Sequence, residues 1–343
     1  MVLEEKSSRI FNSTFVRPAQ FYLSGFSNIP HVKYFYVFLC FVYIMTVLGN
    51  GFLLSVIYLV KTLHTPKYLI VFNLALVDLC GSTALIPKLL DTFLFDRRYI
   101  VYEACLSYMF FVFFFGAVES WTLVFMAYDR FIAICFPLRY HSFVTKPAIV
   151  AMLLFKWIFL LSIIGLMVGL LDRISFCRSL VIRSFFCDHG PVYRLACNDI
   201  TLNVIAVYLV FITVLCIPLI LIIFTYVCIS VALNRIVSGE KRLRALKTCT
   251  SHLILVGVFF LPLLGTNFAS VASHIHPNAR IINSTLTHTI PALLNPIIYA
   301  LKTEEMLNAI KKLYKRYSLS STNSQKFQNH QTVEQHCIHI NKC

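Results

Sequence analysis

The chain has 343 residues, of which 58% are hydrophobic and 13% are charged. A soluble domain carries about 25% charged residues, so this composition excludes an ordinary soluble protein. The apolar residues form blocks of about 20, the length that crosses a bilayer as a helix. We therefore expect an all-α membrane protein whose helices form one bundle.

The formal net charge of +15 could indicate nucleic-acid binding, but its placement argues against that partner. Most of the excess positive charge falls in the segments expected on the cytoplasmic side, such as residues 235–247 and 302–316. The raw count of Lys and Arg differs less between the two sides. The placement agrees with the positive-inside rule and an outside N-terminus.

Residues 1–33 are expected to form an extracellular tail, because they are polar and lack the apolar core of a signal peptide. Asn12-Ser13-Thr14 is a sequon that predicts glycosylation at Asn12. A second sequon begins at Asn283, and we expect it to be unused because it adjoins the last span.

Seven apolar spans are expected within residues 34–301. They cover residues 34–60, 68–89, 105–134, 148–169 and 203–233, a sixth span that opens at 247, and 286–301. Pro218 and Pro262 each remove a backbone donor inside a span and predict bends. An odd number of spans without internal repeats argues against a transporter or channel.

Two acids, Asp78 and Glu119, lie inside the expected spans, where an isolated charge is costly. Together they could share a proton, bond Asn50 and Asn295, or enclose a small cation such as Na⁺. Lys156 lies in the fourth span, and we expect it to snorkel inward or to pair with a neighbouring span.

Asp129 and Arg130 end the third span, so this pair should lie near the water boundary. Asp129 can hold Arg130 in one conformation and release it to another partner in a second, which is the outline of a switch. On the opposite side, the four cysteines Cys105, Cys177, Cys187 and Cys197 allow three pairings.

Three stretches carry a family resemblance. Residues 126–140 read Met-Ala-Tyr-Asp-Arg-Phe-Ile-Ala-Ile-Cys-Phe-Pro-Leu-Arg-Tyr, residues 244–253 read Arg-Ala-Leu-Lys-Thr-Cys-Thr-Ser-His-Leu, and residues 291–299 read Pro-Ala-Leu-Leu-Asn-Pro-Ile-Ile-Tyr. The chain resembles the odorant-receptor branch of the rhodopsin-like G-protein-coupled receptors. Arg244 departs from that pattern, because it stands where the family usually has Lys.

This resemblance implies a seven-transmembrane helix bundle over residues 34–301. A short amphipathic cytoplasmic helix over 302–317 and a disordered tail over 318–343 should follow. It implies the disulfides Cys105–Cys187 and Cys177–Cys197, and it favours a sodium site among the intramembrane polar residues Asn50, Asp78, Glu119 and Asn295. It also implies that G-protein coupling and switching use Asp129, Arg130, Tyr226, Lys247, Asn295, Pro296 and Tyr299.

A ligand pocket is expected in the outer half of the bundle. One helical face leads from Glu119 to Gly116 and Val112, bordered by Phe113 and Ala117. The resemblance adds Val210, Phe211 and Val214 from the fifth span, Phe260, Leu264 and Asn267 from the sixth, and Thr285 and His288 from the seventh. Val112 stands where amine receptors keep an Asp, which disfavours a simple amine ligand.

The resemblance therefore implies a plasma-membrane odorant receptor that activates a stimulatory, olfactory-type heterotrimeric G protein and raises cyclic AMP. A rhodopsin-like receptor for a peptide, lipid or nucleotide is the alternative, and a membrane transporter is a further one. No Gly-rich phosphate loop, metal-spaced His/Cys set or nucleophile elbow is present in the sequence. We therefore expect no enzyme activity and no cofactor apart from the candidate sodium ion.

Overall fold

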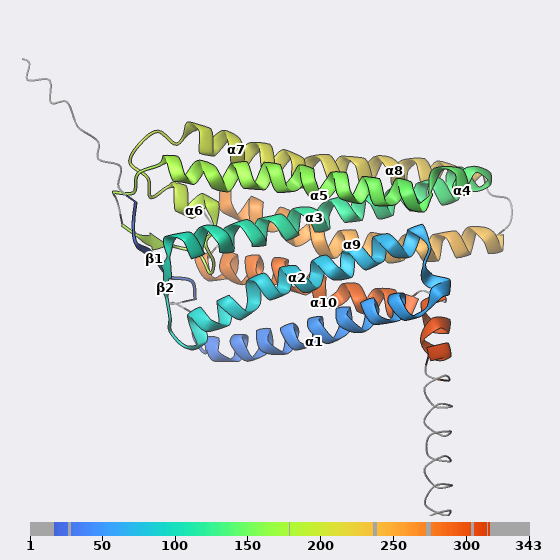
Figure 1. The fold of residues 1–343 in the computed structure, drawn as a ribbon, viewed down its shortest axis with the longest axis horizontal. Coiled ribbons are helices and arrows are strands. Elements are labelled where there is room, and N and C mark those ends of the chain that lie inside the picture. The colour runs from blue at the N-terminus through green and yellow to red at the C-terminus, as the bar shows by residue number, and fades with distance from the viewer. Residues whose placement is uncertain are drawn as a thin grey trace, which may run out of the picture.

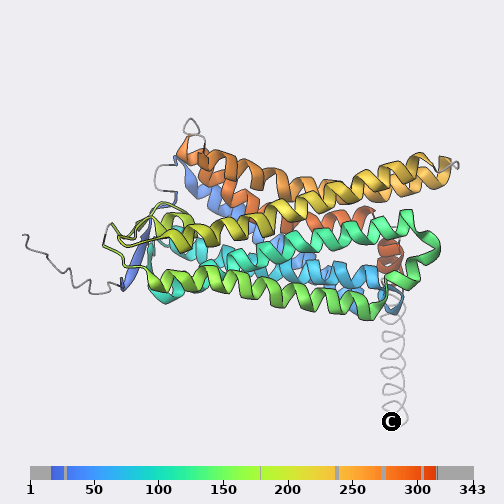
Figure 2. The same cartoon turned by 90° about the horizontal axis from the view of Figure 1, so that it is seen from above.

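The computed structural model describes residues 17–26, 29–177, 179–235, 239–271, 276–302, 305–313 and 315. These residues form a bundle of seven long helical segments that run side by side (Figures 1 and 2). The segments are α1 (Val32–Leu59), α2 (Pro66–Leu94), α3 (Tyr102–Cys135), α5 (Lys146–Gly169), the unit of α7 (Thr201–Phe211), η4 (Ile212–Cys216) and α8 (Ile217–Asn234), α9 (Gly239–Val271) and α10 (Pro277–Lys302). The predicted fold class is confirmed.

The seventh helix begins earlier than expected, at Pro277 rather than at residue 286. Six helices among the described residues are long and apolar enough to cross a membrane, and α10 is not one of them. The reason is that α10 turns polar side chains into the bundle, where Thr285, Thr289 and Asn295 are buried. The first turns of this helix carry further polar residues, among them Asn278, Arg280 and Asn283, which made its start resemble a loop in the sequence.

The fifth span contains a π-helical turn, η4, directly before Pro218. A proline lacks the N–H that would bond the carbonyl one turn earlier, and π-bulges commonly accompany such a break. Pro218 was expected to bend this helix, and the structure shows a change of helix type next to it within a continuous span.

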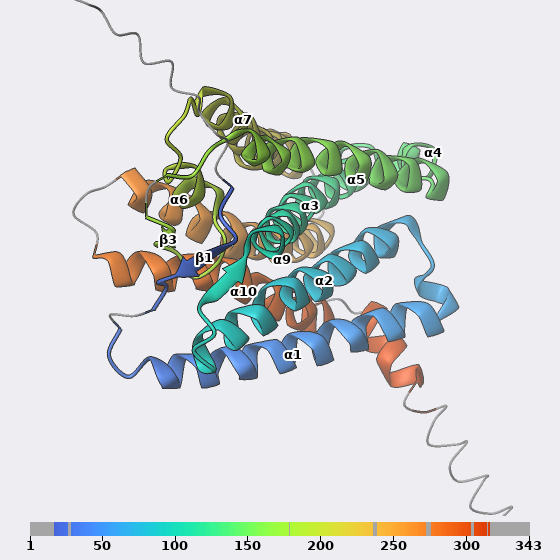
Figure 3. The same cartoon turned by 60° about the vertical axis from the view of Figure 1, so that its left-hand side comes forward.

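A small sheet covers one end of the bundle and was not predicted. Its strands are β1 (Gln20–Leu23), β2 (Tyr99–Val101) and β3 (Val181–Ile182), in the order β2-β1-β3. β1 pairs antiparallel with β2 and parallel with β3. Figure 3 shows β1 and β3 close to the short helix α6 (His189–Tyr193). The segment before the first span is therefore tied to two loops of the same end.

Several contacts fix this sheet on the bundle. Phe21 is fully buried and packs edge-on against Phe176. Arg17 forms an ion pair with Asp172, which also accepts a hydrogen bond from Tyr102. Disulfides join Cys105 to Cys187 and Cys177 to Cys197, the two pairs that the resemblance implied.

The opposite end of the bundle carries the short elements η1 (Lys61–Leu63), η2 (Pro137–Arg139) and α4 (Tyr140–Phe143), and the helix of residues 305–313. This last helix lies beside the end of α1 in Figure 1. It is amphipathic, because Met306 and Ala309 are buried whereas Lys311 and Lys312 are exposed. Asn12, Tyr317 and the tail expected over 318–343 lie outside the described residues.

Candidate functional site: an outer site, a buried polar cluster and an inner switch

The residues expected in the outer site come from α3, the fifth span, α9 and α10, and the structure divides them. Val112, Phe113, Ala117, Val210 and Val214 pack in the apolar cluster at the end of the bundle that carries the sheet, whereas Phe211 and Phe260 pack in the cluster toward the other end. Val112, Ala117, Val210, Phe260 and Thr285 are buried. Phe113, Gly116, Phe211, Val214, Asn267 and His288 are partly buried. Leu264 stands apart, because 38% of it is exposed. The lining is mostly apolar with few polar groups, as in most small-molecule sites.

Two aromatic residues of the long loop, Phe185 and Phe186, cover this site. The ring of Phe186 lies 6.0 Å from that of Phe113 on α3 and 5.7 Å from that of His288 on α10. Phe185 packs on Phe186 at 4.8 Å. The disulfide of the next residue, Cys187, anchors the pair to α3. The sequence signal for this cover was adjacency to Cys187, which our pocket prediction did not use.

His288 has a defined hydrogen-bonding state in this site. Its Nδ1 lies 2.8 Å from the carbonyl oxygen of Ser284. A carbonyl only accepts, so Nδ1 must carry the proton. In the neutral ring, Nε2 is then an acceptor. The site therefore offers an imidazole nitrogen that can receive a hydrogen bond.

The bulge in the fifth span is tied to α3 by two side chains. Ser120 donates from Oγ to the carbonyl of Val214 at 2.6 Å, and Trp121 donates from Nε1 to the carbonyl of Thr213 at 3.0 Å. These are the two carbonyls that an N–H at position 218 would reach in α or π geometry, and Pro218 has none. Residues 120 and 121 thus satisfy the acceptors that the proline frees.

Polar residues meet at mid-depth, as the sequence predicted. Asn295 donates from Nδ2 to Asp78 Oδ2 at 2.8 Å and to Glu119 Oε1 at 3.3 Å. Asn50 does not bond to either acid. Its Nδ2 donates instead to the carbonyls of Thr46 at 3.0 Å and Ala292 at 2.9 Å.

The position of Asn50 follows from a close approach of two helices. A Cβ at Gly49 would lie 3.0 Å from Cγ of Pro296, so glycine lets α1 contact α10 here. Pro296 also cannot donate to the carbonyl of Ala292, four residues earlier. Asn50 supplies the donor that this carbonyl would otherwise lack.

Lys156 pairs with a neighbouring span, one of the two outcomes expected. It is buried, and its Nζ donates to Thr122 Oγ1 on α3 at 2.8 Å. Asn73 on α2 donates to the same oxygen at 3.1 Å, and Thr122 donates to the carbonyl of Val118 at 2.6 Å. Trp157 donates to Asn73 Oδ1 at 2.8 Å. These bonds join α2, α3 and α5 in one network.

The inner end holds Arg130 in a closed arrangement. Asp129 is buried, with Oδ2 at 3.4 Å from Arg130 Nη1. Tyr140 donates to Asp129 Oδ1 at 2.7 Å. Both oxygens of Asp129 are therefore engaged, and its charge holds the guanidinium against α3.

His252 links three helices next to this pair. Its Nε2 lies 3.1 Å from the carbonyl of Leu123 on α3, and its Nδ1 lies 2.8 Å from the hydroxyl of Tyr226 on α8. The carbonyl requires a proton on Nε2, so Tyr226 donates to Nδ1. The rings also stack at 5.8 Å. His252 was noted only as part of a motif, and its bridging role was missed.

The remaining switch residues divide into two groups. Tyr299 is buried and its hydroxyl lies 3.2 Å from Sδ of Met126, one turn before Arg130 on α3. Lys247 is exposed on the first part of α9. The structure thus brings Tyr226 and Tyr299 to α3 near Arg130 and leaves Lys247 on the surface.

Two groups in the outer loop, Asp188 and His189, have pKa values shifted toward their neutral forms. Burial raises the pKa of Asp188 to about 6, against the opposing effect of hydrogen bonds from the backbone of Gly190 and His189. Burial lowers the pKa of His189 to about 4, although its bond to the Met167 carbonyl opposes this. Both shifts favour neutral side chains where α6 packs on the bundle.

Comparison with known proteins agrees with this architecture. The structure of squid rhodopsin aligns with a TM-score of 0.65 over 82% of this chain and 84% of that one, at 17% sequence identity. The bundle, the loop disulfide to α3 and the Asp129–Arg130 pair at its inner end thus belong to a rhodopsin-like seven-helix fold.

The sequence comparisons narrow this class. The family model for olfactory receptors matches residues 39–316. Human olfactory receptor 5K4 is 36% identical over 88% of this chain and 93% of the relative. Mouse olfactory receptor 5K16 is 37% identical over 88% and 94%. The chain belongs to the olfactory receptor family, whose members are G-protein-coupled receptors and not enzymes.

Proposed function

We propose that this receptor binds a small odorant beneath Phe186 and activates a stimulatory, olfactory-type G protein, which raises cyclic AMP. The N-terminus lies outside the plasma membrane in this proposal. The observation that carries it is the covered site, in which Phe113, Phe186 and His288 approach each other from α3, the loop and α10.

The chemistry of the lining selects a class of odorant. Val112 offers no charge to an amine, whereas Nε2 of His288 can accept one hydrogen bond. An apolar molecule with one hydroxyl group fits this combination. An alcohol should therefore be a better agonist than its methyl ether, which has no proton to donate.

Cells expressing the receptor with a stimulatory G protein test the proposal. An odorant panel that pairs alcohols with their methyl ethers should raise cyclic AMP, with the alcohols more potent. His288→Phe should remove the difference, and Arg130→Ala should abolish signalling at equal surface level. Normal signalling by Arg130→Ala would show that the switch assignment is wrong.

The buried polar cluster is proposed to hold a sodium ion. In and next to this cluster, four buried oxygen atoms have no hydrogen-bond partner among the described residues: Thr46 Oγ1, Asn50 Oδ1, Asp78 Oδ1 and Ser82 Oγ. They form i, i+4 pairs on the adjacent helices α1 and α2. Neutral and carboxylate oxygens are the ligands that hard cations prefer, so the residues present fit this ion.

Thermal stability in different salts separates a cation from a shared proton. We expect NaCl to raise the melting temperature more than choline chloride at equal ionic strength, and Asp78→Asn to remove the difference. Equal melting in both salts would favour a proton shared between Asp78 and Glu119.

A further inference from the structure

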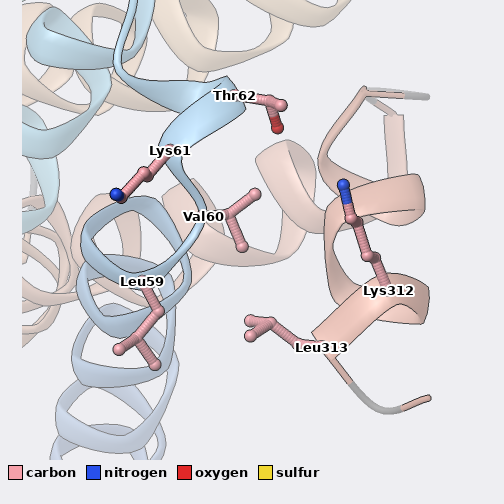
Figure 4. A pocket seen from close by; sticks show the side chains of 6 residues that line it. All are labelled: Leu59, Val60, Lys61, Thr62, Lys312 and Leu313. Carbon is pink, nitrogen blue, oxygen red and sulfur yellow. The ribbon is translucent and has the colours of Figure 1, made fainter. Parts of the chain in front are cut away.

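A cavity lies between the end of α1 and the helix of residues 305–313, far from the outer site. Its volume is about 270 Å³, near the lower end for small-molecule sites. Figure 4 shows its lining, with Val60 and Leu313 on opposite sides of the space and Thr62 and Lys312 along one edge. The lining residues are Leu59, Val60, Lys61, Thr62, Lys312 and Leu313.

The charges near this cavity are unbalanced. Glu305 is already engaged, because its Oε2 lies 2.9 Å from Lys67 Nζ and accepts a hydrogen bond from Tyr68 at 2.7 Å. Lys61 and Lys312 have no ion-pair partner among the described residues, and both are exposed. Figure 4 shows the Lys312 ammonium and the Thr62 hydroxyl beside the space between the apolar walls, whereas the Lys61 side chain starts from the lining and is directed away from Lys312. A border of this charge suits an amphiphilic anion.

An apolar path leads from the cavity along α1. Phe41, Met45, Leu48, Phe52 and Leu59 are 58%, 40%, 61%, 52% and 57% exposed. Their spacing of four, three, four and seven residues places them on one face of the helix. Leu59 belongs both to this face and to the cavity wall. An acyl chain could lie on the stripe while its headgroup reaches the lysines.

We infer that this cavity binds the phosphorylated headgroup of an anionic phospholipid of the phosphoinositide class. A phosphomonoester carries about −1.5 to −2 charges and three acceptor oxygens, which can bond the Lys312 ammonium and the Thr62 hydroxyl. The flexible Lys61 side chain has to turn toward the cavity to add a second ammonium group. Basic pockets at the cytoplasmic end of transmembrane helices suit such headgroups. The bound lipid joins the end of α1 to the helix of residues 305–313.

Native mass spectrometry of the full-length receptor in detergent tests this inference, with phosphatidylinositol 4,5-bisphosphate as the probe. We expect one tightly bound lipid per receptor. The variant Lys61→Gln/Lys312→Gln should weaken binding by about tenfold or more, given the energy of each lysine near an anionic headgroup. The control Lys311→Gln/Lys315→Gln removes the same charge from two lysines next to Lys312 in the sequence that do not line the cavity, and should change binding by less than about threefold.

Three results would overturn the inference. An equal loss in both variants would indicate a diffuse basic surface. Equal binding of phosphatidylserine would show that a phosphomonoester is not recognised. Equal competition by free inositol trisphosphate would identify a soluble anion as the ligand. The measurement needs no membrane orientation or odorant, so it is independent of the proposed signalling function.

Discussion

The bond between Ser120 and the Val214 carbonyl gives a test of why the fifth span contains a π-turn. Ser120→Ala removes the donor and leaves the carbonyl unpaired, because Pro218 cannot replace it. An unsatisfied buried acceptor costs about 1–3 kcal/mol, whereas side-chain bonds between membrane helices average about 0.6 kcal/mol. We therefore expect Ser120→Ala to destabilise the receptor by about 1 kcal/mol, between these values.

A second substitution turns this into a double-mutant cycle. Pro218→Ala restores an N–H that can reach the carbonyl of Val214 or Thr213. In that background, Ser120→Ala should cost almost nothing, so the coupling energy should be about 1 kcal/mol. The effects of two substitutions on the free energy of unfolding are expected to be non-additive when both residues act on the same acceptor.

The assay heats purified receptor in detergent to a series of temperatures. Size-exclusion chromatography then measures the fraction that remains folded at each temperature, which gives the melting temperature. A loss of 1 kcal/mol lowers the melting temperature by about 2 °C for a chain of this size. Ser284→Ala is a control, because the Ser284 carbonyl and not its side chain bonds His288. If Ser120→Ala lowers the melting temperature equally with and without Pro218, then Ser120 does not replace the donor that the proline lacks.

Three further outcomes are expected. Phe186→Ala should raise the half-maximal odorant concentration by about tenfold, since a buried aromatic contact is lost; unchanged potency in the cyclic AMP assay would argue against the loop as a cover. His252→Ala should raise cyclic AMP without odorant by several-fold, because it removes the link from α9 to the Leu123 carbonyl; unchanged basal cyclic AMP would contradict that role. Hydrogen bonds from Lys67 and Tyr68 lower the pKa of Glu305 although burial opposes them. Its contribution, under about 1 kcal/mol, is therefore present above pH 4.5 and lost as pH falls below it, so Glu305→Gln should lower the melting temperature at pH 7 but not at pH 4.

The buried acids show what a sequence can predict for this fold. An acid within an apolar span needs a partner, so Asp78 and Glu119 were expected to meet, and Asn295 joins them. The partner of Asn50 could not be assigned in the same way. Its choice of the Ala292 carbonyl depends on how closely Gly49 lets two helices approach, which is a property of packing.

The small sheet at the outer end of the bundle could not be predicted from the sequence pattern. β1 has only four residues, too few for a clear alternation, and its partner strands lie about 80 and 160 positions away in the sequence. Phe186 was missed for a related reason. Its position over His288 depends on the path of a loop that a disulfide fixes, and local sequence does not determine that path.

One face of α10 connects the three levels of the receptor. His288 faces the covered outer site, Asn295 bonds both buried acids, and Tyr299 reaches Met126 beside the inner switch. The carbonyl of Ala292, between the first two, is held by Asn50. The spacing of four, three and four residues keeps all four positions on one side of the helix. In the function proposed above, a ligand that moves His288 would act on the same helix that contacts the two acids and Met126, so α10 would link the odorant site to the arginine switch.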